Sequence, residues 1–138
     1  MNPSEVDLLI AEYRETNAHL RANTTQFVNW FSFFLTFSFI AAAAFATVSI
    51  GRPELRGSRF SYGVEVVFLL MHILALTGIL VYRRYIVACH CKVEEIIAKT
   101  GVSGASPIPI RFCKWMTDLM AAGFVVSYFT WFAMLFVW

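Results

Sequence analysis

A single histidine, His72, lies near the middle of a long apolar segment, residues 64–82. Ionisable side chains inside a membrane are rare and mark ligand sites, proton paths or contacts between helices. The imidazole of His72 could ligate the metal of a haem or chlorin, carry protons in a polar pore, or hydrogen-bond to a neighbouring helix. A bis-histidine haem within one chain is excluded, because the other histidines, His19 and His90, lie in polar flanking sequence. A haem shared across a symmetric dimer, or held by one axial ligand, remains an alternative. We expect the hydrogen-bonding role and no resident cofactor.

Three further polar residues, Ser38, Thr77 and Asp118, interrupt apolar sequence and are candidates for lining a pore. Asp118 is the only acidic residue of the third apolar segment. A buried carboxylate is costly unless it is paired. We expect it to form an ion pair with Lys114, four residues earlier, or with Arg111 or Arg83, which lie at a similar depth. A cation or proton site is the alternative reading of the same carboxylate.

The run Cys89-His90-Cys91 has the residue types of a metal site but the wrong spacing. Adjacent side chains on a helix point about 100° apart, so they cannot converge on one ion. The chain also has no Gly-rich phosphate loop, no Ser–His–Asp set and no paired carboxylates. We expect no metal and no enzymatic activity.

Three apolar stretches position these residues: 27–50, 64–82 and 115–138. A bilayer core of roughly 30 Å needs about 20 helical residues, and each stretch meets that length. The composition agrees, with 59% hydrophobic and only 14% charged residues. The sequence therefore predicts an all-α integral membrane protein with three transmembrane helices, lying in the lipid bilayer as one domain, 1–138. A net charge of +2 is too small for a nucleic-acid partner.

Helix-forming sequence continues beyond the first two apolar stretches. We expect an amphipathic cytoplasmic helix at 4–26, an outer loop at 51–63, a cytoplasmic helix at 83–100 and a second loop at 101–111. Gly51 and Gly101 are predicted to end the two long helices in the left-handed conformation. The extensions would pair as an antiparallel cytoplasmic hairpin. This hairpin would hold Arg14, His19, His90 and Glu95, with Arg14 close to Glu95.

Positive charge predicts the orientation, since Lys and Arg collect on the cytoplasmic side. Eight of the eleven basic residues fall on the side of the N-terminus and three, Arg52, Arg56 and Arg59, on the other. We therefore expect the N-terminus inside and the C-terminus outside, in a prokaryotic inner membrane.

Small residues could close the bundle or join protomers, because membrane helices associate through close backbone approach and interhelical hydrogen bonds. They are Ser38, Ala42, Ala46, Gly78, Gly123 and Ser127. We expect a small non-enzymatic protein acting by assembly, as a homo-oligomeric pore, membrane effector or sensor. The alternative is an accessory subunit that stabilises a larger respiratory, photosynthetic or transport complex.

Overall fold

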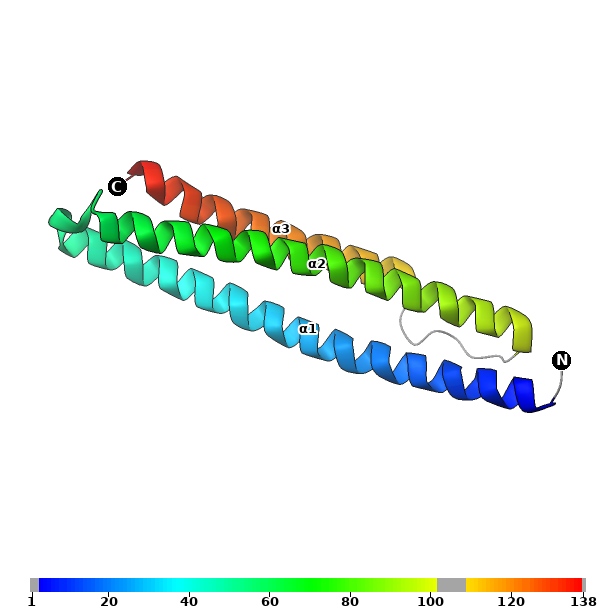
Figure 1. Ribbon diagram of the computed structural model, residues 1–138. Coiled ribbons are helices and arrows are strands. Elements are labelled where there is room, and N and C mark those ends of the chain that lie inside the picture. Colours follow the sequence, from blue (N-terminus) through cyan, green and yellow to red (C-terminus); the bar gives the residue numbers. More distant parts are fainter. Residues whose placement is uncertain (1–2, 102–108, 138) are drawn as a thin grey trace.

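The computed structural model describes residues 3–101 and 109–137, which form an all-helical structure (Figure 1). The order is α1 (Pro3–Gly51), a short 3₁₀ helix η1 (Pro53–Leu55), α2 (Arg59–Thr100) and α3 (Ile110–Val137). Three helices are long and apolar enough to cross a membrane, which confirms the predicted helical class. Most of the predicted loop 101–111, and Trp138 at the end of the third predicted span, lie outside the described residues.

α1 and α2 run well beyond α3 at the end of the molecule that holds the N-terminus (Figure 1). α1 is continuous over 49 residues, and neither Gly nor Pro occurs between Ser4 and Ile50 to interrupt its hydrogen-bond ladder. The bundle therefore has a three-helix part, formed around the apolar stretches, and a part in which only α1 and α2 continue.

The turn between α1 and α2 differs from the prediction at two points. Gly51 is helical, and Gly57 has the positive φ of 67° instead. The carbonyl of Ser49 near the end of α1 accepts a hydrogen bond from Arg56 Nε at 2.9 Å. α2 starts at Arg59 rather than 64, because Ser58 caps it by accepting from the backbone N–H of Ser61 at 3.2 Å. The predicted loop 51–63 is therefore shorter than expected.

The other predicted helix end is confirmed. Gly101 has φ 66° and its N–H donates to the Ile97 carbonyl at 2.9 Å. Glycine adopts this left-handed conformation without a steric penalty, because it has no Cβ. α2 thus ends where the sequence predicted.

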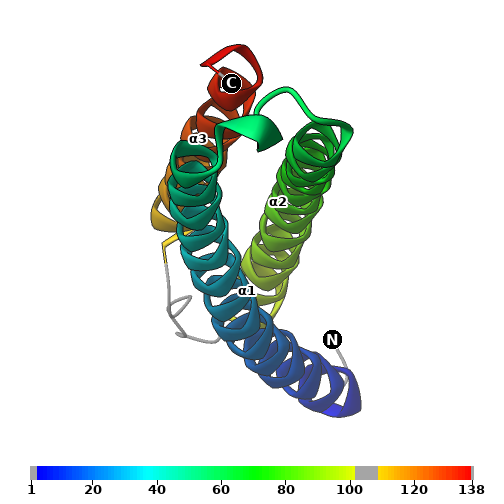
Figure 2. The ribbon, with the colours of Figure 1, turned by 90° about the vertical axis from the view of Figure 1, so that its left-hand side faces the viewer.

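The three helices run alongside one another (Figure 2). The core of the three-helix part draws on every helix. The ring of Phe124 from α3 meets the ring of Phe34 from α1 edge-on, with centroids 5.0 Å apart. Ala75 and Ile79 from α2 and Met120 from α3 complete this buried cluster. The large side chains fill the space between the helices, so the centre of the bundle is packed rather than hollow.

Candidate functional site: a buried polar cluster joining three helices

Four buried polar side chains meet between the three helices. Ser38 comes from α1, His72 from α2, and Ser127 and Trp131 from α3, and each is at most 1% exposed. Ser127 and Trp131 share one face of α3 because they are four residues apart. We call these four residues the polar cluster.

The hydrogen bonds of the polar cluster form one directed chain. His72 Nδ1 lies 2.7 Å from the Phe68 carbonyl oxygen, which can only accept, so Nδ1 carries the proton and Nε2 is an acceptor. Ser127 Oγ lies 2.8 Å from Nε2 and donates to it. Ser38 Oγ lies 3.0 Å from Ser127 Oγ and 3.2 Å from Nε2, and Trp131 Nε1 donates to Ser38 Oγ at 3.0 Å.

Each polar hydrogen in this chain has an acceptor when Ser38 donates to Ser127. Trp131 then donates to Ser38, Ser38 to Ser127, Ser127 to His72, and His72 to its own backbone. A neutral imidazole satisfies the whole set, and no partner outside the protein is needed. The polar cluster therefore links α1, α2 and α3 by side-chain hydrogen bonds deep in the apolar part of the bundle.

Aromatic rings enclose the polar cluster. The Phe34 ring meets the His72 ring edge-on at 5.3 Å, and Phe68 stacks on Trp131 with centroids 4.0 Å apart. A serine oxygen this close to an imidazole is also the start of a nucleophilic site, but burial keeps substrate-sized molecules away from it. Haem or chlorin does not fit either, because both ring nitrogens of His72 are engaged in hydrogen bonds.

The other two predicted intramembrane candidates lie apart from the polar cluster. Thr77 is exposed, and its hydroxyl donates to the Ile73 carbonyl of its own helix at 2.9 Å. Asp118 is also exposed and forms an ion pair with Arg83, Oδ1 to Nη1 at 2.6 Å. Of the three cations predicted for Asp118, the structure pairs it with Arg83 on α2 rather than with Lys114 or Arg111 on α3. The structure therefore brings together Ser38 and His72 but not Thr77 or Asp118.

The predicted small residues mostly face other helices of the same chain. A Cβ on Gly123 would lie 3.5 Å from Phe31 Cζ of α1, an ordinary van der Waals distance, so this glycine faces α1 without being required for the two helices to meet. Gly78 faces Trp30 in the same way, at 3.9 Å. Ala42 is buried and Ala46 is half-buried on α1.

The helical extensions are tied by contacts other than the predicted one. Lys92 of α2 forms an ion pair with Glu12 of α1. Glu95 pairs with Lys99 on its own helix at 2.6 Å, whereas Arg14 is exposed. The expected proximity of Arg14 and Glu95 yields no ion pair among the described residues.

The two histidines of the extensions have different surroundings. His19 is exposed and lies 3.6 Å from the Glu15 carboxylate on its own helix. His90 is buried, with Nε2 3.7 Å from Cys113 Sγ of α3. Burial lowers the pKa of His90, although the carboxylate of Glu94 raises it in part. His90 thus belongs to the packing of α2 on α3.

Two members of the polar cluster were not predicted from the sequence. Trp131 was not singled out, and Ser127 was considered only as a small packing residue. The signal was their spacing of four residues, which places two hydrogen-bonding groups on one face of α3. Nothing in the sequence, however, indicates that this face meets Ser38 and His72.

A second group of polar and small residues lies on the opposite, exposed side of α1. We call this group the outer stripe; it consists of Thr25, Asn29, Ser32, Thr36, Ala43 and Thr47, all exposed. Their spacing of three, four or seven residues keeps them on one side of the helix.

Comparisons with protein family models, curated proteins and solved structures find no match to this chain.

Proposed function

We propose that this chain is a non-enzymatic membrane protein that acts by self-assembly, with the outer stripe of α1 at the contact between copies. The observation that carries this proposal is the exposure of Asn29, Ser32 and Thr36 within apolar sequence. Lipid offers these groups no hydrogen bonds, whereas a neighbouring helix offers both hydrogen bonds and close backbone approach.

The distribution of polar groups supports α1 as the contact helix. The exposed face of α3 within its apolar stretch carries large apolar side chains, including Leu119, Val126 and Phe129. The exposed face of α2 is similar, with Leu70, Ile73 and Leu80 beside Thr77. Such faces suit lipid, because apolar area gains nothing by leaving it. Exposed polarity is concentrated on α1.

A pore would run between copies rather than through one protomer. The bundle centre is filled by Phe34, Phe124 and Trp131, and the polar cluster has its hydrogen bonds satisfied internally. In a ring of protomers the amide of Asn29 and the hydroxyls of Ser32 and Thr36 would face water, whereas the hydroxyls of Thr25 and Thr47 donate to carbonyls of α1. We place the N-terminus and the paired extensions of α1 and α2 in the cytoplasm of a prokaryotic cell. There the extensions would act as the sensor by binding a partner or ligand.

The test is the mass of the protein purified alone in mild detergent, measured by light scattering. We expect a discrete multiple of the 15.7 kDa protomer. Thr36→Val should shift it toward the monomer, whereas Thr77→Val, a matched change on α2, should leave it unchanged. Ion flux through liposomes that contain the protein should fall in parallel with assembly. A monomer, or an oligomer equally insensitive to both changes, would contradict the proposal.

The second candidate is an accessory subunit of a larger membrane complex. It is favoured by exposed aromatic side chains spaced along one side of α3, at Phe129, Phe132 and Phe136. Aromatic residues are common anchors where proteins dock. Under this alternative the protein alone is an unstable monomer and is recovered intact only together with a partner. Phe132→Ala would then release the partner, and Thr36→Val would not.

A further inference from the structure

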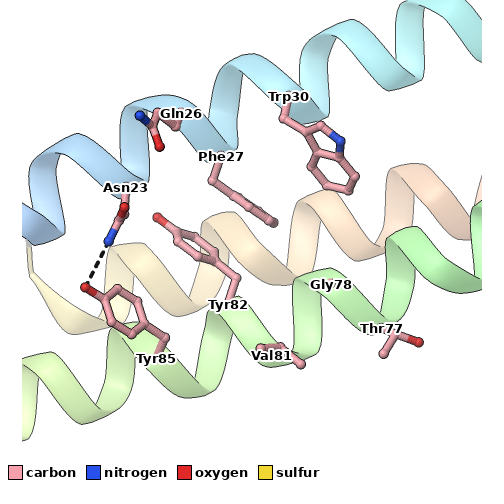
Figure 3. Close-up of a pocket in the computed structure, with 9 residues that line it drawn as sticks. All are labelled: Asn23, Gln26, Phe27, Trp30, Thr77, Gly78, Val81, Tyr82 and Tyr85. Atoms are coloured by element: carbon pink, nitrogen blue, oxygen red, sulfur yellow. Dashed lines mark hydrogen bonds between the residues drawn. The ribbon is translucent and has the colours of Figure 1, made fainter.

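A groove opens between α1 and α2 on the side of the bundle (Figure 3). Its volume is about 630 Å³, which is within the usual range for sites that hold one small molecule. Residues that line it from α1 include Asn23, Gln26 and Trp30, and those from α2 include Gly78, Val81 and Tyr85. It lies away from the outer stripe, since its α1 residues fall on a different side of that helix.

The groove has a polar end and an apolar end. At the polar end Asn23 Nδ2 donates to the Tyr85 hydroxyl at 2.9 Å, and Gln26 lies beside them (Figure 3). At the other end the lining is Trp30, Gly78 and Val81, together with Thr77, whose hydroxyl donates to the Ile73 carbonyl of its own helix. The polar end coincides with the start of the first apolar stretch and the end of the second. A molecule in the groove would therefore have its head at the membrane interface and its chain in the hydrocarbon.

Gly78 provides the space at the apolar end. A Cβ at this position would still lie 3.9 Å from the Trp30 ring, so the glycine is not required for the helices to meet. A larger side chain would occupy the groove itself. This position can therefore be used to fill the groove without forcing α1 and α2 apart.

Positive charge flanks the polar end. Arg84 is exposed and lies three residues after Val81, hence on the same side of α2. Its neighbour Arg83 is neutralised by Asp118. Arg84 forms no ion pair with any described residue, so its charge is available to an anion at the mouth of the groove.

We propose that this groove holds one anionic phospholipid from the adjoining leaflet. The acyl chain would lie along Trp30, Gly78 and Val81, and the phosphate would lie near Arg84, with Asn23 and Gln26 able to donate hydrogen bonds to the head. The proposal is independent of self-assembly, because neither the groove nor Arg84 includes a residue of the outer stripe.

The test is native mass spectrometry of the delipidated protein after addition of phosphatidylglycerol or phosphatidylcholine. We expect one phosphatidylglycerol per protomer, bound several-fold more tightly than phosphatidylcholine. Gly78→Leu should lower occupancy at least tenfold, whereas Ala122→Leu on the exposed face of α3 should leave it unchanged. Equal loss in both variants, or none in either, would overturn the site.

Arg84→Gln keeps the groove and removes the charge, so it tests the head-group assignment in a protein with an intact fold. We expect the preference for phosphatidylglycerol to disappear while phosphatidylcholine binding is retained. Lipid with brominated acyl chains should quench wild-type fluorescence more than that of Trp30→Phe, because Trp30 lines the groove. An unchanged preference in Arg84→Gln, or equal quenching of the two proteins, would refute the proposed pose.

Discussion

The two sides of α1 present similar residue types to very different surroundings. On the inner side Ser38 is fully buried and its oxygen contacts His72, Ser127 and Trp131. On the outer side of the same helix Ser32 is exposed. A hydroxyl in a membrane helix therefore does not by itself indicate a pore or a contact. What matters is whether its hydrogen bonds are completed within the protomer.

The same contrast separates stability from assembly. The polar cluster uses all its donors internally, so it should stabilise one protomer and contribute nothing to the contact between copies. The outer stripe contributes nothing to the core of one protomer, so its changes should affect assembly alone. Four predictions test this separation, in order of decreasing expected effect.

Replacing the central imidazole should have the largest effect. His72→Leu removes the acceptor of Ser127 and the donor to the Phe68 carbonyl, and leaves polar groups unpaired in a buried site. We expect the free energy of unfolding in detergent to fall by about 2–3 kcal/mol. Denaturant titration of the purified protein measures this, with Thr77→Val as the control. An unchanged midpoint would show that the polar cluster does not hold the helices together.

Matched serine changes on one helix compare the two sides directly. Ser38→Ala leaves the Trp131 N–H without an acceptor and should cost about 1–2 kcal/mol of unfolding free energy. Ser32→Ala removes an exposed hydroxyl and should cost less than about 0.5 kcal/mol. Thermal unfolding of both variants under one detergent condition gives the difference. Equal losses would remove the distinction between the two sides.

The amide of Asn29 should affect assembly and not folding. Asn29→Leu would remove the proposed interhelical hydrogen bond, worth about 0.6–1.5 kcal/mol in lipid, so the dissociation constant of the oligomer should rise about three- to tenfold. Dilution of labelled protein in liposomes, followed by energy transfer, measures the dissociation constant. The unfolding midpoint of the separated protomer should match that of wild type. A loss of protomer stability would place Asn29 with the inner side.

His90, a second buried histidine, allows a test by pH, and we expect its effect on stability to be the smallest of the four. Burial lowers the pKa of His90, and the titratable groups near it include Cys113 of α3 and Glu94 of its own helix. The unfolded chain therefore takes up a proton near the ordinary pKa of about 6.5, while the folded protein takes it up only at lower pH. The contribution of His90 to stability is therefore complete above a pH of about 6.5. It falls as the pH decreases from the pKa of the unfolded chain to the lower pKa of the folded protein.

We expect wild type to lose stability between pH 7.5 and 5.5, and His90→Gln to lose less over the same interval. The Lys99 ammonium lowers the pKa of Glu95, so this carboxylate titrates below the interval and does not interfere. Unfolding midpoints at the two pH values measure the difference. Identical pH dependence in the two proteins would show that the pKa of His90 does not differ between the folded and unfolded chains.

The helices were predictable because their signals are local. Long apolar stretches without Pro, and Gly101 after a helix-forming run, are read directly from neighbouring residues. The prediction for Gly51 was wrong because the Ser49 carbonyl is satisfied by Arg56, a residue beyond the turn. The contact between the helical extensions was not predicted either, since the ion pair that joins them is Lys92 with Glu12. Errors arose where a partner lies across a turn or on another helix.

The sequence alone determined that the chain forms three long helices, and it identified Ser38 and His72 as unusual residues in apolar surroundings. The tertiary structure decided that these two meet Ser127 and Trp131 and that Thr77 and Asp118 do not. The physical reason is rotation about each helix axis, since turning a helix by about 100° exchanges one face for the next. That rotation is fixed by packing among all three helices, and no single stretch of sequence contains it.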